Sequence, residues 1–330
     1  MPAVAVAVIT ADGASVQSIR GMANVESGEC VTPDHWWDLA SLTKVLVTAP
    51  EVLAMVDSGA LALADRLAAV WPRASGTPLA PVTVAQLLSH DAGLPGLWPL
   101  YRRGFGNGAD LVDTILREGG ERPPGSGPIY SDAGFILLGE LVSHLSGQPL
   151  DELARRRGRV SYAPTPGPCV ATERCPWRNR LLVGEVHDEN AFVLGGVAGH
   201  AGAFGRLDDV AAYAAQWLVG SPSTPTISPT TAQAATQCWA ENQGGERFGL
   251  GWWLSPTRAL GGPRPGPRSY GASGFVGNRL WIEPARGYAV VILSNRIHPV
   301  RGDRAPFDIW CGRLLARIGE LWDQNRVDAR

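Results

Sequence analysis

The sequence predicts a mixed α/β (α+β) fold, an antiparallel sheet flanked by helices with a mainly helical region inserted between its strands. Strand-like alternation of apolar residues occurs near the start of the chain and again after residue 270, and helix-like apolar runs fill the middle. A chain with this order builds one sheet from both of its ends. We therefore expect residues 1–60 and 190–330 to form an α/β sandwich, and residues 61–189 to form the helical insertion.

The first elements are the most clearly patterned. Residues 3–10 and 15–21 alternate on either side of an Asp-Gly turn, which predicts a β-hairpin. The apolar run from Val45 to Val56 predicts a buried helix that ends near Gly59, with a kink or break at Pro50.

The remaining elements follow from periodicity and from glycine and proline breakers. Helices are expected at residues 61–71, 82–90, 110–117, 135–145, 151–159 and 207–218, and an amphipathic helix at about 306–322. Strands are expected at residues 270–275, 279–283 and 288–294. The intervening loops include a proline-rich connection at 160–180, a glycine-rich turn at 195–202 and a Ser/Thr/Pro loop at 220–231.

Composition narrows the possible partners and locations. The chain has 330 residues, of which 45% are hydrophobic and 18% charged, as in a globular protein with a large core. A formal net charge of −2 gives no reason to expect nucleic acid or an anionic membrane as a partner. We expect no membrane span and a cytoplasmic location, or a periplasmic or secreted one if a leader has been removed. Five scattered cysteines, an odd number, do not form a disulfide framework.

The chemistry is predicted around the segment from Asp38 to Lys44. Ser41 and Lys44 are three residues apart, so on a helix their polar ends share a face. A serine needs a base to become a nucleophile, and lysine can serve only if its surroundings let it lose its proton. Lys44 is the single lysine among 29 Lys and Arg residues. Since arginine cannot replace lysine in proton transfer, the position of this one lysine indicates a catalytic pair.

Three short motifs in order carry a resemblance to a known family. They are Ser41-Leu42-Thr43-Lys44, Tyr130-Ser131-Asp132 and Ala272-Ser273-Gly274. With them the sequence resembles the serine β-lactamase and penicillin-binding-protein superfamily, on the branch nearest class C β-lactamases and their esterase relatives. Softer matches lie at residues 87–94, 184–191, 195–202 and 294–299. The resemblance implies a β-lactamase/transpeptidase-like fold with its active site in the cleft between sheet and helical region.

The resemblance also implies roles for individual residues. Ser41 would attack a carbonyl and form an acyl-enzyme, and Lys44 would deprotonate it directly or through Tyr130. Tyr130 would pass a proton to the leaving group. The backbone N–H groups of Ser41 and Phe275 would form the oxyanion hole. Substrate-binding residues would be Asp132, Ala272, Ser273, Gly274 and His200.

Two residues depart from the family pattern. Asp132 replaces an asparagine, so this side chain can accept but not donate a hydrogen bond, and it can hold Lys44 or an arginine instead. Ala272 stands where the family has lysine or histidine, a cation that helps to bind a carboxylate. Its loss argues against an efficient β-lactamase or carboxypeptidase and favours neutral substrates. Arg268 and Arg279 are the candidates to supply charge from nearby.

The sequence therefore predicts a serine hydrolase, most simply an esterase-type enzyme acting on a small ester, amide or peptide-like molecule. A D-amino-acid peptidase, a weak β-lactamase and an acyltransferase remain alternatives within the same fold. The alternative from another class is a catalytically silent penicillin-binding or sensor domain. No cofactor is expected, and no metal, because His187, Asp188 and Glu189 lack the spacing of known ligand motifs.

Overall fold

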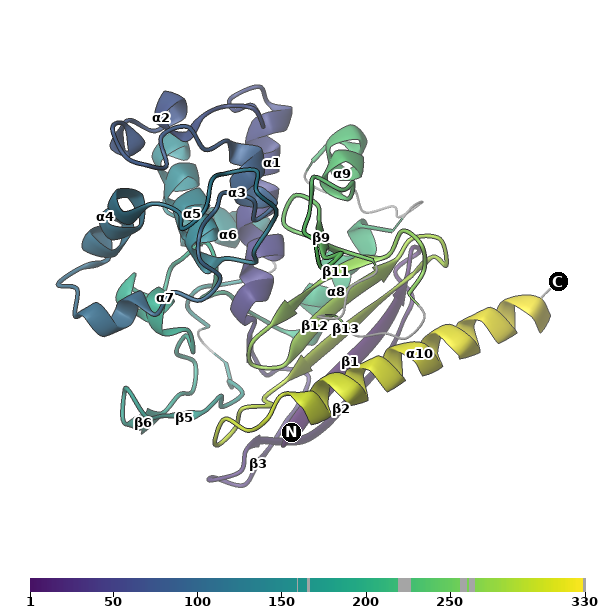
Figure 1. Cartoon of the computed structure of the whole chain (residues 1–330). Helices are drawn as coiled ribbons and strands as arrows, with labels where there is room; N and C mark the ends of the chain where they lie inside the picture. The colour runs from purple at the N-terminus through teal and green to yellow at the C-terminus, as the bar shows by residue number, and fades with distance from the viewer. Residues whose placement is uncertain (159, 165–166, 219–226, 256–259, 261–264, 329–330) are drawn as a thin grey trace.

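An antiparallel sheet crosses the molecule, with its strands drawn from both ends of the chain (Figure 1). The computed structural model describes residues 1–158, 160–164, 167–218, 227–255, 260 and 265–328. Within these residues nine strands form the sheet, in the order β3-β2-β1-β13-β12-β11-β10-β9-β8. Their bounds are β1 Ala3–Thr10, β2 Ser15–Asn24, β3 Glu29–Cys30, β8 Ala240–Glu241, β9 Arg247–Phe248, β10 Trp253–Leu254, β11 Tyr270–Gly274, β12 Asn278–Glu283 and β13 Tyr288–Ser294.

The first strand shows why this sheet has two buried faces. In β1, Ala3, Ala5, Ala7 and Ile9 belong to the main core, whereas the intervening valines pack against the smaller core under the last helix. β1 pairs with β2 on one side and with β13 on the other, so strands from the two ends of the chain lie side by side within the sheet. The predicted sheet built from both ends is confirmed, and with it the fold class.

Helices cover both faces of the sheet and fill the inserted region (Figure 1). Helix α10 (Ala305–Asp328) lies along one face and α8 (Leu207–Gln216) packs against β1 and β13 on the other. The remaining helices are α1 Ala49–Asp57, α2 Leu67–Val70, α3 Val84–Leu88, α4 Gly108–Glu118, α5 Asp132–Ser146, α6 Leu150–Arg157, α7 Glu189–Val193 and α9 Pro229–Ala235. The division into domains at residues 60 and 190 stays a prediction.

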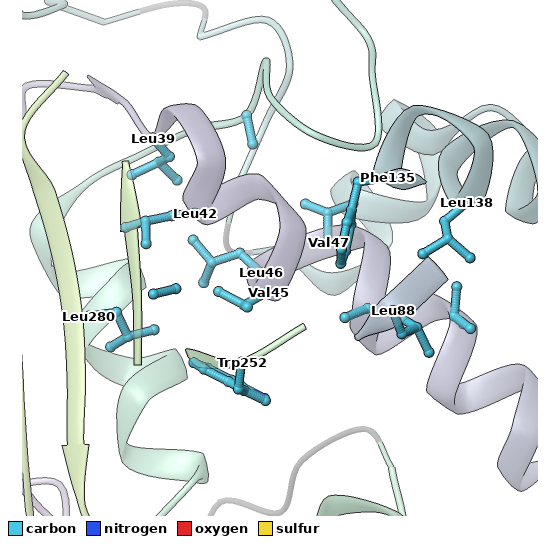
Figure 2. Packing of buried hydrophobic residues seen from close by; sticks show 14 of the residues in the cluster. Leu39, Leu42, Val45, Leu46, Val47, Leu88, Phe135, Leu138, Trp252 and Leu280 are labelled. Atoms are coloured by element: carbon cyan, nitrogen blue, oxygen red, sulfur yellow. The ribbon is translucent and has the colours of Figure 1, made fainter. Parts of the chain in front are cut away.

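The segment that carries Ser41 is buried between the sheet and the helical region. It forms a 3-10 turn (Ala40–Leu42), a π-helical turn (Lys44–Thr48) and then α1, rather than one continuous helix. Pro50 sits in the first turn of α1, where its missing N–H costs no hydrogen bond, so the break comes before the proline. Figure 2 shows Leu42 facing Leu280 of the sheet, and Val47 beside Phe135 of α5.

Several expected elements differ from the structure. Most of the helix expected at 61–71 is extended or turn-like, because Leu67 N–H bonds to Val82 O and Val84 N–H bonds to Asp65 O. Only α2 is helical in this range, and these backbone hydrogen bonds hold the residues next to it against residues 82–84. Short strands at β4 (Trp37–Asp38), β5 (Arg174–Cys175), β6 (Arg180–Leu181) and β7 (Phe204–Gly205) were not expected. The expected loop at 220–231 lies partly outside the described residues, as does residue 159 of the expected helix 151–159.

Candidate active site

Ser41 lies in a tight turn that a neighbouring carboxylate holds in place. The preceding residue, Ala40, has φ of 46°, a left-handed conformation that is unfavourable for a residue with a Cβ. Asp38 Oδ1 accepts the Ala40 N–H at 2.7 Å, and Thr43 Oγ1 donates to Ala40 O at 2.6 Å. Ser41 is in the first helical turn, where backbone N–H groups have no partner within the helix. Its N–H is therefore available to an oxyanion.

Lys44 is buried behind Ser41, and its ammonium is fully hydrogen-bonded. The Nζ atom lies 3.0 Å from Ser41 Oγ, 2.7 Å from Asp132 Oδ1 and 3.1 Å from the carbonyl oxygen of His200. These three acceptors match the three N–H donors of an ammonium. The structure thus brings Ser41, Lys44 and Asp132 together, as their motifs predict.

The charge of Lys44 is set by two opposing effects. Burial alone would lower the pKa of Lys44, but the charge and hydrogen bond of Asp132 and those of Tyr130 outweigh it, so the pKa is raised above 10.5. Lys44 is accordingly an ammonium at neutral pH. The sequence left Lys44 and an arginine as alternative partners of Asp132, and the structure pairs Asp132 with Lys44.

Tyr130 precedes α5 and is fixed by an aromatic cluster. Its ring stacks on Trp253 with a centroid distance of 5.4 Å and lies 4.6 Å from the ring of His90. His90 Nδ1 accepts the N–H of Ser131 at 3.1 Å, which fixes the backbone next to Tyr130. Burial and the charge of Lys44 lower the pKa of His90 to about 3, so this imidazole is neutral. The nitrogen of Lys44 lies 4.9 Å from the centre of the Tyr130 ring.

The end of β11 forms the opposite wall of the site. Gly274 lies so close to the nucleophile segment that a Cβ there would come within 2.8 Å of Leu39 O. Asn278 of β12 donates from Nδ2 to Asp38 O at 2.9 Å, which ties the β11–β12 hairpin to the same segment. Phe275, in the turn after Gly274, has an exposed side chain and keeps the position that the resemblance gives to the second oxyanion donor.

The third motif contributes little that could contact a charged substrate. Ala272 is buried and Ser273 is partly exposed. Arg279 cannot supply the missing cation: its side chain is buried on the α10 side, where it pairs with Asp308. Strand alternation explains this, because the preceding Asn278 faces the Ser41 side. Arg268 is exposed before β11 and has no contact with a site residue among the described residues.

The sequence predicted that His200 binds substrate, but its side chain contacts Asp188 instead of Ser41 or Lys44. The imidazole is fully buried and lies 2.8 Å from Asp188 Oδ1, so only its carbonyl reaches Lys44. Burial of Asp188 opposes its charge, but His200, His187 and the Ala191 N–H outweigh that effect and lower the pKa of Asp188. The glycine-rich segment thus orders the site through its backbone.

Two contributors were missed at the sequence level, Asp38 and His187. Asp38 Oδ2 accepts the His187 N–H at 2.7 Å, and the His187 ring stacks on Phe275 at 5.5 Å. Asp38 therefore joins the turn before Ser41 to the residue that flanks the oxyanion position. An acidic residue shortly before a helix is a visible signal, but its partner 149 positions away is not.

One group of side chains has the composition of a metal site. Ligand atoms of Glu173, Cys175 and Glu189 lie within 4.8 Å of one another. The guanidinium of Arg301 binds both carboxylates, at 2.6 Å from Glu173 and 2.7 Å from Glu189. Because this cation already balances the two charges, the group is better explained as a structural ion-pair network.

Comparison with known proteins gives curated relatives named as a carboxypeptidase and an amidase. A protein of Escherichia coli K12 named as a D-alanyl-D-alanine carboxypeptidase is 29% identical over 87% of this chain and 76% of its own length. A Bacillus subtilis strain 168 protein named N-acetylmuramyl-L-alanine amidase is 29% identical over 79% of this chain and 68% of its own length.

Solved structures give the same fold. The class C β-lactamase of Rhodobacter sphaeroides has a TM-score of 0.75 at 17% identity, over 96% of this chain and 95% of its own. SurE, solved with D-Leu, has a TM-score of 0.71 at 26% identity, over 97% of this chain and 71% of its own.

In the described part of the chain, none of the helices is both long and apolar enough to cross a membrane. The β-lactamase family model matches residues 1–310, nearly the whole chain. Together with the shared fold and the relatives named as carboxypeptidase and amidase, this match indicates a serine hydrolase. The chain belongs to the β-lactamase family.

Proposed function

We propose that this hydrolase acts through an acyl-enzyme on Ser41 and cleaves small esters or amides. The observation that carries the proposal is the contact of Lys44 Nζ with Ser41 Oγ, Asp132 and His200 O, with Tyr130 beside it. It gives the serine a charged neighbour that stabilises an alkoxide and a phenol that can exchange a proton.

The charge of Lys44 favours one of the two proton routes. A charged ammonium cannot take the proton of Ser41, and Asp132 keeps Lys44 charged. In this route Tyr130 acts as a phenolate beside the Lys44 ammonium: its oxygen takes the proton of Ser41 as Oγ attacks the carbonyl carbon. The resulting phenol then gives that proton to the leaving oxygen or nitrogen, which restores the phenolate. A water molecule, activated in the same way, releases the acyl group. Throughout these steps the Lys44 ammonium stabilises negative charge on the oxygens of Ser41 and Tyr130.

Backbone N–H groups complete the mechanism. The N–H of Ser41 and that of Phe275 would bind the oxygen of the tetrahedral intermediate, a contribution of roughly 10²–10³ in rate for each donor in other enzymes. Asp38 supports both donors, through Ala40 on one side and through His187 and its stacking on Phe275 on the other.

The uncharged side chain of Ala272 favours one class of substrate over the others. An alanine at this position provides no charge for a β-lactam or peptide carboxylate, so an ester or amide without that requirement is the simplest substrate. A D-amino-acid amide or peptide is the second candidate. It is supported by the relatives named as D-alanyl-D-alanine carboxypeptidase and amidase, and by the structural relative solved with D-Leu.

The test follows the fate of Ser41. Wild-type protein is given p-nitrophenyl butyrate, D-alanine p-nitroanilide and nitrocefin, and intact-mass spectrometry after rapid acid quench detects the acyl-enzyme. We expect turnover of the ester or the D-alanine amide, with the acyl mass on the peptide that contains Ser41. Ser41→Ala removes both signals, whereas Ser89→Ala, at a buried serine after α3, keeps the acyl mass.

Two other results would decide differently. Turnover that survives in Ser41→Ala would contradict the mechanism. An acyl mass on Ser41 that forms once and is not released would favour the silent sensor domain over the enzyme, since such a domain is acylated without turnover.

A further inference from the structure

A cavity of about 460 Å³ lies beside α5, a volume that suits a small organic ligand. One wall is α5 itself, which presents Ile136, Gly139, Glu140 and Ser143 at spacings of three and four residues. The connection between α5 and α6 in the helical region (Figure 1), residues 194 and 197–199 form the other walls. The described residues that line the cavity include none of those assigned to the Ser41 reaction.

The polar side chains in this lining are poorly matched by the protein itself. Arg73 lies 3.8 Å from the carboxylate of Glu140 but binds Asp113 much more closely, at 2.7 Å. The Oε1 atom of Gln148 is buried and has no hydrogen-bond partner among the described residues. Buried acceptors without a good partner are costly, so a donor on a bound ligand would stabilise them.

The charges around the cavity favour a cation. Burial raises the pKa of Glu140, because Arg73 offsets the cost of its charge only in part. The last turn of α5, with its partly negative carbonyl groups, ends beside Gly147 of the lining. The positive end of α6 begins nearby, but Asp151 and Glu152 in its first turn offset it. A ligand with a positive charge would therefore stabilise the ionised form of Glu140.

The rest of the lining is largely apolar, with Ile136, Leu150, Leu194 and Val197 among its residues. Such walls favour a ligand with a hydrocarbon or aromatic body. A metal ion fits less well, because Glu140 is the one carboxylate among the described residues of the lining. The complementary ligand is a small organic ammonium, with a charge at one end and an apolar body at the other.

Two walls of the cavity lead directly to Lys44. Helix α5 begins at Asp132, whose Oδ1 accepts a hydrogen bond from Lys44 Nζ at 2.7 Å. Gly199, in the opposite wall, precedes His200, whose carbonyl oxygen accepts from the same nitrogen at 3.1 Å. The two walls also touch, since a Cβ at Gly139 would come within 2.8 Å of the Cα of Gly199. A ligand between these walls would therefore act on the backbone that holds two acceptors of Lys44.

We propose that this cavity is a second binding site, which takes a small organic ammonium and slows the Ser41 reaction when it is occupied. The ammonium binds Glu140 and the carbonyl end of α5, and the apolar body packs on Leu150 and Val197. The 3.0 Å contact of Lys44 with Ser41 depends on the acceptors around Lys44, so moving them lowers the rate. The effect on rate rests on the proposed acyl-enzyme function, whereas the binding does not.

The first test measures binding and its location without any turnover. Ser41→Ala protein labelled with nitrogen-15 is titrated with 2-phenylethylamine, an ammonium at neutral pH, and with 2-phenylethanol, which has the same body without the charge. We expect the amine to shift the backbone amide signals of Gly147, Ala198 and Gly199, and to bind at least tenfold more tightly than the alcohol. This ratio is the usual worth of a hydrogen bond to a charged group, roughly 10-fold or more.

Variants of the lining separate this cavity from other places where an amine could bind. Glu140→Gln should weaken binding of the amine by roughly 10-fold or more. Ser143→Leu fills space on the α5 wall but keeps Glu140, and it should also weaken binding. Glu121→Gln, a matched change at an exposed carboxylate outside the lining, should leave Kd unchanged. Absence of amine binding, or a Kd that neither Glu140→Gln nor Ser143→Leu changes, would overturn the proposal.

The second test measures the effect on rate with p-nitrophenyl butyrate. Saturating 2-phenylethylamine should lower kcat by roughly fivefold in wild type, a modest coupling between two sites, and should not do so in Glu140→Gln. A rise in KM alone, or an N-butyryl product that forms equally in Glu140→Gln, would place the amine in the active site and overturn the proposal. Glu140-dependent binding with an unchanged kcat would refute the action on Lys44. If wild type hydrolyses no ester, the proposed function fails, and the titration of Ser41→Ala protein still decides whether the cavity binds the amine.

Discussion

The two walls of the site differ in how closely they follow the family pattern. The helical wall holds Ser41, Lys44 and Tyr130, each in the expected motif and joined by short hydrogen bonds. The sheet wall ends in Phe275 and has lost the motif cation, with Arg296 standing beside it from another loop.

The difference is physical. Proton transfer requires particular groups within about 3 Å of each other, so the helical wall cannot change residue type without losing the reaction. Binding a substrate charge needs only a cation within reach, and several elements can place one. The sheet wall can therefore exchange its recognition residue while the chemistry stays fixed.

The largest effect should come from Lys44→Arg, which tests whether the helical wall needs an ammonium. Arginine keeps a positive charge, but its planar guanidinium cannot reproduce the three acceptors around Nζ in a buried space. We expect kcat to fall by about 10³-fold, because the oxygens of Ser41 and Tyr130 lose the ammonium that stabilises their negative charge. Steady-state kinetics on p-nitrophenyl butyrate measures it.

The control for that variant exchanges the same two residue types elsewhere. Arg157→Lys changes the ion pair between α6 and Glu51 of α1 and should keep kcat within about twofold. A Lys44→Arg enzyme with near wild-type kcat would mean that any cation suffices, and the two walls would then not differ as described.

Asp38→Asn should have the next largest effect, because Asp38 joins the two walls. An amide has one acceptor oxygen, so either the Ala40 or the His187 N–H would face an NH2 group. We expect kcat to fall about 10²-fold through misplacement of Ser41, with KM little changed. The free energy of unfolding should fall by about 1–3 kcal/mol.

The rate of Ser41 labelling by a fluorophosphonate distinguishes positioning from general destabilisation. Labelling should slow in Asp38→Asn at a temperature where the protein is fully folded, as shown by circular dichroism. Asp34→Asn, at an exposed carboxylate four residues away, should label at the wild-type rate. Wild-type labelling in Asp38→Asn would leave this carboxylate a purely structural role.

The contrast between the walls also explains how much could be predicted from the sequence. Ser41 and Lys44 share a helical face, which spacing alone reveals, and alternation located β1 and β11 to β13. The prediction of a helix at 61–71 was wrong for most of its length, because the backbone there pairs with residues 82–84. Periodicity in the sequence does not encode this contact.

The sheet wall was the least predictable part of the site. Arg296 lies in one of the softer family matches, residues 294–299, but nothing in the sequence distinguishes it from the 27 other arginines as a contact of Phe275. Arg279, one of the two arginines named from the sequence as a source of charge, faces α10 because side chains alternate along β12. Only the register of the strands shows which face of the sheet the Arg279 side chain lies on.

Asp132→Asn should give a smaller effect on rate and a clear effect on pH dependence. Asp132 helps to raise the pKa of Lys44, so its removal lets Lys44 lose its proton at lower pH. The alkaline limb of kcat/KM should move to lower pH by about one to two units, with kcat at neutral pH reduced by about tenfold. Asp151→Asn, at an exposed carboxylate of α6, should leave the profile unchanged.

Stability should follow the same sign. The folded pKa of Lys44 lies above 10.5, so the ion pair contributes fully below that pH and is lost as pH rises through the folded value. In Asp132→Asn the folded pKa of Lys44 is lower, so less stability is lost above the unfolded value. Urea unfolding at about pH 9 and about pH 11.5 measures it: wild type should lose more stability over this range than Asp132→Asn, and an equal loss in the two proteins would contradict Asp132 as the partner.

The smallest effect is expected from restoring the motif cation with Ala272→His. The substitution leaves Ser41, Lys44 and Tyr130 in place, so kcat/KM for the uncharged ester p-nitrophenyl butyrate should change by less than about threefold. For nitrocefin, which carries a carboxylate, the added histidine should raise kcat/KM by about tenfold, worth about 1.4 kcal/mol. An equal change for the two substrates would show that position 272 does not select for substrate charge, and that the sheet wall does not set recognition as described.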